Sequence, residues 1–127
     1  MANTIRFAFE NLGIPVSLCS LKHCHISDIM DELLESKYIA LGSPTLNNTV
    51  LPSMGAFLTY LKGLKPQNKH AFAFGSYGWF ASALKEVEDI IKPLNWKISD
   101  TISTKYVANE ESNTKLIATV QKLVKGE

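Results

Sequence analysis

Residues 38–48, YIALGSPTLNN, join a continuous apolar run to a short polar loop, and residues 71–79, AFAFGSYGW, repeat the arrangement. Neither apolar run alternates with polar residues, which is typical of strands covered on both faces by helices. A segment of helical length and character follows each loop, and this alternation predicts βαβ units around a parallel sheet. The two stretches therefore predict an α/β fold with a buried parallel sheet.

The rest of the chain extends this pattern in both directions. Helices are expected at residues 4–12, 26–36, 51–64, 80–92 and 110–125, and strands at residues 15–21, 38–42 and 71–75. Residues 96–107 are expected to be extended, with a break at Ser99 and Asp100. Gly13 stands where a left-handed residue commonly ends a helix. Ser27 and Asp28 suit a helix N-terminus, and the polar run 109–113 is interpreted as a helix cap.

Composition limits the class of protein. A chain of 127 residues that is 46% hydrophobic and 20% charged predicts a single domain spanning residues 1–127. Thirteen basic and twelve acidic residues leave a formal charge of +1, so no global field favours nucleic acid or an anionic membrane. The two cysteines fit a reducing compartment better than a disulfide scaffold. No apolar run approaches the roughly 20 residues of a membrane span, and a cytoplasmic protein is expected.

The two polar loops are the expected ligand site. In an open parallel sheet, ligands bind beyond the carboxyl ends of the strands, where both loops begin. Gly75 and Gly78 allow close approach of backbone amides, while Tyr77 and Trp79 offer aromatic faces. A flat heteroaromatic ring with a polar edge fits this combination, and flavin matches best. Its redox chemistry needs no acid, base or nucleophile from the protein.

These loops also carry a family resemblance. LGSPTLNN (41–48), FLTYLKGLKP (57–66) and AFGSYGW (73–79) together resemble the flavin domain of flavodiiron proteins, and HISDIMDELLES (25–36) is similar to the helix before the first loop. The resemblance runs from about residue 17 to residue 92. It implies a flavodoxin-like three-layer sandwich whose loops hold FMN, with Trp79 stacked on the ring. The implied cofactor-binding residues are Ser43, Pro44, Thr45, Leu46, Asn47 and Asn48 from one side and Ser76, Tyr77, Gly78 and Trp79 from the other.

The resemblance further implies an electron-transfer domain. In the family, a rubredoxin-like donor or a flavin reductase supplies electrons, and a diiron centre in a separate domain reduces oxygen or nitric oxide. The ligand motifs of that centre are absent from these 127 residues. A diiron domain in trans and a homo-oligomeric state are therefore expected partners, and an enzymatic activity of the chain by itself stays undecided.

The chain departs from the family pattern in two places. The family begins with a central strand and a hydroxyl-rich phosphate loop, of which only Asn3 and Thr4 could be a remnant, so the expected fold is N-terminally truncated. Phe80 and Ala81 replace the usual small residue and glycine after the second loop. Three explanations are open: the chain is an edited or cleaved fragment, the sheet is rearranged so that two remaining strands pair directly, or a second copy of the chain supplies the edge.

Other interpretations remain open beside the flavin carrier. A flavodoxin-fold remnant that binds no FMN and acts as an oligomerisation or binding module is the alternative from a different class. A quinone-type oxidoreductase ranks last, since no nicotinamide pocket is located. The run 22–25, KHCH, is a poor metal site because its ligands are too tightly spaced. Trp79 is favoured as a stacking platform over a core residue, whereas Trp96, Phe57, Phe72 and Phe74 are interpreted as packing.

Overall fold

The structure, a computed structural model, describes residues 1–43, 52–77, 82–99, 101–105 and 109–125. In chain order its elements are α1 (Ala2–Asn11), α2 (Ile26–Glu35), β1 (Tyr38–Gly42), α3 (Pro52–Leu64), β2 (His70–Tyr77), α4 (Ser82–Ile91), the 3-10 turn η1 (Lys92–Leu94), β3 (Lys97–Ile98), β4 (Ile102–Lys105) and α5 (Glu110–Val124). The five expected helices are present within two residues of their expected ends. Residues 51, 80 and 81, which the expected helices included, lie outside the described part.

The described strands form a parallel sheet with β2 in its middle. β1 pairs with β2 along one side, with Tyr38 opposite His70. On the other side β3 pairs with residues 70–71 of β2 and β4 with residues 74–77. β3 and β4 therefore share one strand position, which confirms the expected interruption of this extended segment. Asp100, within that break, lies outside the described residues.

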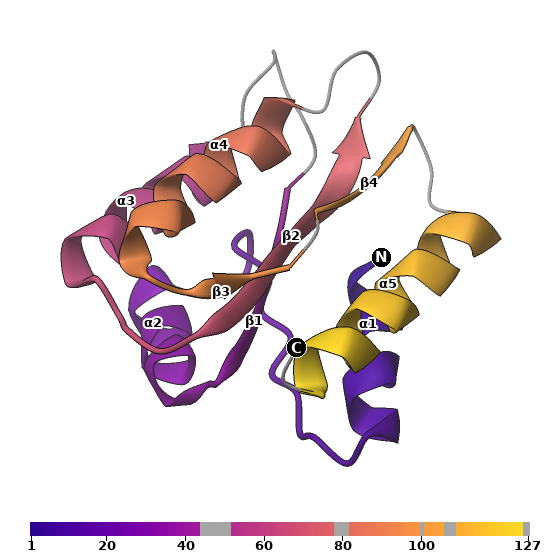
Figure 1. Cartoon of the computed structure of the whole chain (residues 1–127). Helices are drawn as coiled ribbons and strands as arrows, with labels where there is room; N and C mark the ends of the chain where they lie inside the picture. Colours follow the sequence, from indigo (N-terminus) through magenta and orange to yellow (C-terminus); the bar gives the residue numbers. More distant parts are fainter. Residues whose placement is uncertain (44–51, 78–81, 100, 106–108, 126–127) are drawn as a thin grey trace.

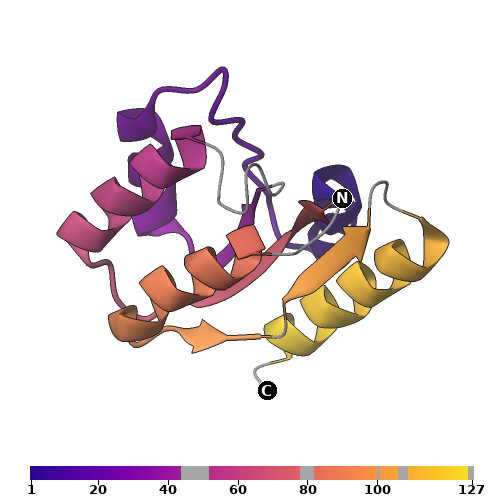
Figure 2. The same ribbon diagram turned by 90° about the horizontal axis from the view of Figure 1, so that it is seen from above.

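Helices cover both faces of the sheet (Figure 1). α2, α3 and α4 lie on one face, and α1 and α5 lie on the other, as the view from above also shows (Figure 2). Each face has its own apolar core: Ala71 and Ala73 of β2 pack in the first, and Phe72 packs in the second. Burial on both faces explains why the strand sequences do not alternate with polar residues.

The ends of α1 and α5 follow from their capping residues. Gly13 has φ 78°, and its N–H donates to Glu10 O while Ile14 N–H donates to Phe9 O. This pair of hydrogen bonds is a Schellman motif, so the expected left-handed glycine is confirmed. At α5 the Asn109 side chain accepts from Ser112 N–H, and the Ser112 hydroxyl accepts from Asn109 N–H, each at 2.9 Å. This capping box confirms the polar run as a cap.

The N-cap residue completes the start of α2, and a lysine from another segment completes its end. At its start, Nδ1 of His25 accepts a hydrogen bond from Ser27 N–H at 3.1 Å. At its end, Nζ of Lys69 donates to Leu34 O at 3.0 Å and to Ser36 O at 2.6 Å. Lys69 is only 7% exposed, and this burial lowers the pKa of its ammonium group below the ordinary value. The lysine thus ties the end of α2 to the start of β2.

Three expectations at the start of the chain are wrong. Residues 15–21 form no strand in the described part of the chain, because no described strand runs beside them to supply ladder hydrogen bonds. Direct pairing of this segment with β1 is also wrong, since β1 pairs only with β2 among the described strands. Asn3 and Thr4 belong to α1 rather than to a loop, and the Thr4 hydroxyl donates to Oδ1 of Asn113 at 3.3 Å.

The aromatic residues assigned to packing are buried to different degrees. Trp96 is 6% exposed, and its indole N–H donates to Pro66 O at 2.7 Å. Phe57 and Phe72 are fully enclosed, whereas Phe74 is half-buried against the α1 and α5 core. Within the described ranges, no helix is long and apolar enough to cross a membrane.

Candidate functional site

The candidate site is the edge of the sheet where β1 and β2 end. β1 stops at Gly42, while β2 continues past it to Tyr77. The Ser43 N–H donates to Phe74 O at 3.1 Å, which extends the pairing of the two strands by one step. The first predicted ligand loop therefore begins beside Phe74 of β2, whereas β2 itself continues three residues further, to Tyr77.

Gly75 makes the close approach of these strand ends possible. A Cβ built on Gly75 would overlap the carbonyl oxygen of Ser43, and it would lie 3.0 Å from the carbonyl carbon and 3.3 Å from Cδ2 of Leu84. The obstacle is backbone held by the Ser43 hydrogen bond, so a side chain has no room unless the strands separate. Gly75 was expected to allow close approach of a ligand, which stays a prediction; the structure shows instead that it allows close approach of the Ser43 carbonyl.

The structure describes three of the ten predicted cofactor-binding residues. Ser43 is 2% exposed, and Ser76 and Tyr77 are half-buried. The other seven, Pro44, Thr45, Leu46, Asn47, Asn48, Gly78 and Trp79, lie outside the described residues. Ser76 and Tyr77 were expected in a loop but belong to β2, because β4 provides them with partners at Thr104 and Lys105.

The described groups at this edge fit a flat ring with a polar rim. Ser43 and Ser76 bring hydroxyl groups, and Tyr77 brings a half-buried aromatic ring with its own hydroxyl. Gly75 leaves no side chain between the two strand ends. Hydroxyls, backbone amides and an aromatic surface hold a heteroaromatic ring by hydrogen bonding and stacking. The donor set is therefore compatible with flavin.

The segment 22–25 contributes to local structure. Nδ1 of His25 is occupied by the N-cap hydrogen bond of α2. In the described part of the chain, no group of three or more His, Cys, Asp or Glu side chains is arranged to hold a metal ion.

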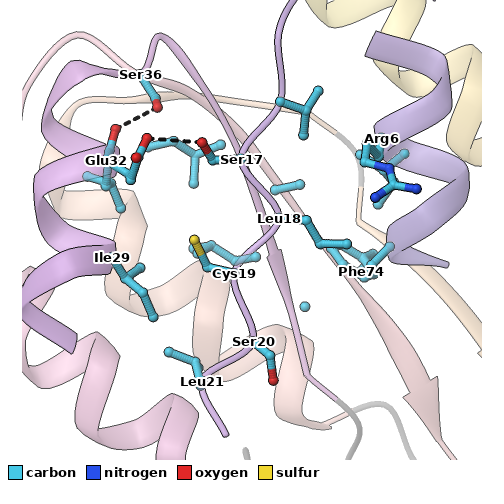
Figure 3. A pocket seen from close by; sticks show the side chains of 18 of the residues that line it. Arg6, Ser17, Leu18, Cys19, Ser20, Leu21, Ile29, Glu32, Ser36 and Phe74 are labelled. Carbon is cyan, nitrogen blue, oxygen red and sulfur yellow. Dashed lines mark hydrogen bonds between the residues drawn. The ribbon is translucent and has the colours of Figure 1, made fainter. Parts of the chain in front are cut away.

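A large groove opens into the same edge. It has a volume of about 1090 Å³ and lies between residues 14–22 and β1. Figure 3 shows its lining, with Leu18 and Cys19 on the extended segment and Phe74 toward the opposite side. Ser43, Gly75 and Ser76 line one end of the groove, so the groove and the candidate ligand edge are continuous.

The sequence signals for the groove lining were present but indirect. Apolar residues of α1 and α2, such as Ile5 and Ile29, were read only as helix faces, yet they line the groove. The groove lies between residues 14–22, which were expected to include a strand, and β1.

The fold and the edge define a flavodoxin-like α/β domain, and comparison with known proteins agrees. A sequence profile for the family described as Flavodoxin matches residues 1–118. The rubredoxin-oxygen oxidoreductase of Megalodesulfovibrio gigas is 38% identical over 101 residues, which are 80% of this chain and 25% of that protein.

Two solved structures extend the agreement to the fold. The structure of rubredoxin oxygen:oxidoreductase from Desulfovibrio gigas superposes with a TM-score of 0.94 at 32% identity, covering 98% of this chain and 31% of that one. The flavodiiron protein from Giardia intestinalis superposes with a TM-score of 0.86 at 27% identity, covering 98% and 32%.

The chain belongs to the flavodoxin family. Its similarity to flavodiiron proteins, expected from the two loops, is confirmed, as is the flavodoxin-like parallel fold. The chain spans between a quarter and a third of the length of the first curated relatives it matches, with shares of 29%, 27% and 25%.

Proposed function

We propose that the chain is an FMN-binding electron-transfer domain of the kind that forms the C-terminal part of flavodiiron oxygen and nitric oxide reductases. The observation that carries the proposal is the backbone contact between β1 and β2 at this edge. The Ser43 N–H donates to Phe74 O, and Gly75 packs on the Ser43 carbonyl. The first ring-binding stretch of the resemblance begins at Ser43, and the second, residues 76–79, follows Gly75 along the chain. Membership of the flavodoxin family supports a flavin as the ligand.

The proposed site has two sides. Residues 43–48 hold one rim of the FMN ring, and residues 76–79 hold the other, with the Trp79 indole stacked on its face. FMN supplies the capacity to accept and release electrons. The chain's own residues bind the ring, orient it, keep water from its face and set the hydrogen bonds to its rim. The close backbone approach at Gly75 fixes the relative position of the two sides.

The proposed partners are redox proteins. One relative is called a rubredoxin-oxygen oxidoreductase and others are called flavorubredoxins, which supports a rubredoxin-like donor or a flavin reductase for this chain. A diiron domain, supplied in trans or as part of a longer protein, is the proposed acceptor. Self-association of the chain is also part of this proposal, and sedimentation measures it directly.

An absorbance titration with FMN tests the function. Saturable binding near or below micromolar concentration is expected, with a shift of the flavin bands. Trp79→Ala should weaken binding by about 1 to 3 kcal/mol, because it removes an aromatic contact. Tyr60→Ala is the matched control, since Tyr60 is an aromatic residue of α3 that is 48% exposed. An unchanged dissociation constant for Trp79→Ala removes that residue from the site.

The groove beside β1 favours a second candidate function. This candidate is a flavodoxin-fold remnant that binds no FMN and serves as a binding or oligomerisation module. The open groove would be its binding surface. The titration separates the two candidates, because a module of this kind gives no saturable flavin signal.

A further inference from the structure

The two cysteines of the chain lie on either side of one hydrogen-bonded turn. Cys19 belongs to the extended segment beside the groove, and Cys24 precedes His25, the N-cap residue of α2. Between them, the Ser20 carbonyl oxygen accepts hydrogen bonds from His23 N–H at 3.1 Å and from Cys24 N–H at 2.8 Å. The turn therefore folds the chain back, so that Cys24 returns to Ser20, the residue next to Cys19.

Both thiol side chains lie on the same side of the chain. Cys19 and Cys24 are half-buried, and each packs against the core of α2, α3 and α4. Figure 3 shows Cys19 directed to α2, whereas Leu18 points the other way, toward Phe74. Two side chains that flank one closed turn and share one face are neighbours, which is the arrangement that a disulfide requires.

The two thiols also interact with each other. Burial raises the pKa of the Cys19 thiol above its ordinary value, and the Cys24 thiol adds to the rise through its charge and through a side-chain hydrogen bond. The Glu32 carboxylate, which accepts a hydrogen bond from the Ser17 hydroxyl at 3.0 Å, raises it further. A hydrogen bond between thiols needs neighbouring sulfur atoms. The interaction therefore agrees with the placement that the turn and the shared face give.

We propose that Cys19 and Cys24 are a thiol–disulfide exchange site, which a low-molecular-weight disulfide oxidises reversibly to an intramolecular disulfide. In the first step, one cysteine thiolate attacks the S–S bond of the reagent, so that a mixed disulfide forms and one small thiol leaves. The second cysteine then attacks the protein sulfur of the mixed disulfide, which forms the internal S–S bond and releases the second small thiol. Two electrons pass from the cysteine pair to the reagent, and the two protons leave with the small thiols.

The disulfide joins one wall of the groove to the start of α2. Residues 19–22 line the groove, and Cys24 adjoins the cap of the helix. A bond between the two cysteines restricts the turn, chiefly in the unfolded chain, so oxidation stabilises the folded state. A reversible bond is compatible with the reducing compartment expected from the sequence, where disulfides are transient. The site is defined by the chain alone and does not depend on flavin binding.

Exchange with glutathione tests the proposal on the unmodified chain. The reduced chain is equilibrated with mixtures of reduced and oxidised glutathione, alkylated with iodoacetamide and analysed by intact mass spectrometry. The expected product has lost two hydrogen atoms and takes up no alkyl group. The same equilibrium in urea gives the value for the unfolded chain, in which cysteines four residues apart also meet by chance. The effective concentration of the thiol pair should be about tenfold higher in the folded chain.

A variant that keeps two cysteines separates folded geometry from nearness in sequence. Cys19→Ser combined with Leu18→Cys moves one thiol to the neighbouring position, which is exposed and faces away from α2. In urea this variant should close about as well as the unmodified chain, but in the folded state it should stop at mixed disulfides with glutathione. Cys24→Ser, which leaves a single thiol, should also give only the mixed disulfide.

The oxidised chain should melt about 5 °C higher than the reduced chain, because a tenfold preference for the disulfide in the folded state stabilises that state by about 1.4 kcal/mol. The proposal is overturned if the folded chain closes no more readily than the chain in urea. It is equally overturned if the folded Leu18→Cys variant closes as well, or if the product is a disulfide between two chains. The comparison of folded and unfolded chain needs no substitution, so it holds even where a variant fails to fold.

Discussion

Replacing Gly75 with alanine tests whether the site depends on close contact between the two strand ends. The new Cβ would overlap the Ser43 carbonyl oxygen and lie 3.0 Å from its carbon. To relieve the overlap, β2 and residue 43 must separate, which breaks the 3.1 Å bond from Ser43 N–H to Phe74 O. The substitution therefore acts on the backbone at the base of both ligand loops, not on a ligand contact.

The expected cost is worked out from three contributions. Losing the hydrogen bond costs about 1 kcal/mol, and overpacking a close-packed region costs about 1 to 3 kcal/mol. Alanine also restricts the unfolded chain, which offsets about 0.4 to 1 kcal/mol. The free energy of unfolding should therefore fall by about 1 to 3 kcal/mol, and FMN affinity should fall about tenfold as the two sides of the site move apart.

Gly63→Ala is the matched control for this experiment. Gly63 lies in α3, and a Cβ built there has no heavy atom within 4 Å. Alanine should stabilise the helix by about 0.5 to 1 kcal/mol and leave FMN affinity unchanged. The two glycine-to-alanine changes thus have opposite expected signs in a urea titration followed by circular dichroism. If Gly75→Ala unfolds with the same free energy as the unmodified protein, the close-approach argument is refuted.

Two further predictions concern stability. Burial, and then the charges of Lys97 and Lys37, lower the pKa of His70 below its ordinary value, so the unfolded state binds the proton better and stability should fall as pH drops from about 6.5 toward the folded-state pKa. His70→Phe should flatten that part of the pH profile of urea midpoints, and an unchanged profile would contradict the assignment. Asn109→Ala removes the capping box of α5 and should cost about 1 kcal/mol by the same measurement, whereas no loss would mean that the cap contributes nothing.

The sequence predicts most of the elements because their signals are local. The strand at Tyr38–Gly42 has its expected ends, and the five helices follow from apolar periodicity and from capping residues such as Gly13 and Asn109. The end of β2 cannot be predicted from its own residues, because it depends on a partner strand. Ser76 and Tyr77 have the composition of a loop, but β4 pairs with them and keeps them in the sheet.

Residues 15–21 were expected to form a strand, but they form none in the structure. Their sequence has a strand pattern, and their side chains alternate between the two cores as a strand requires. A strand, however, is defined by its ladder, and the ladder depends on a neighbour that the pattern cannot supply. The structure places this segment beside the groove and not in a ladder with β1.

The candidate site is predictable in its location and only partly in its detail. Parallel strands place both loops at one edge, and the glycine at position 75 was expected to allow close approach of a ligand. Its contact with the Ser43 carbonyl was not expected from the sequence. Seven of the ten predicted residues lie outside the described part, so their roles stay predictions.

The groove and the ligand edge share Ser43, Gly75 and Ser76, which has a consequence for every binding measurement on this chain. A molecule bound in the groove would contact the same backbone that would hold a ligand at the edge, so the two binding free energies would be linked, and such linkage is reciprocal. An FMN affinity measured on the chain would therefore change when the groove is occupied.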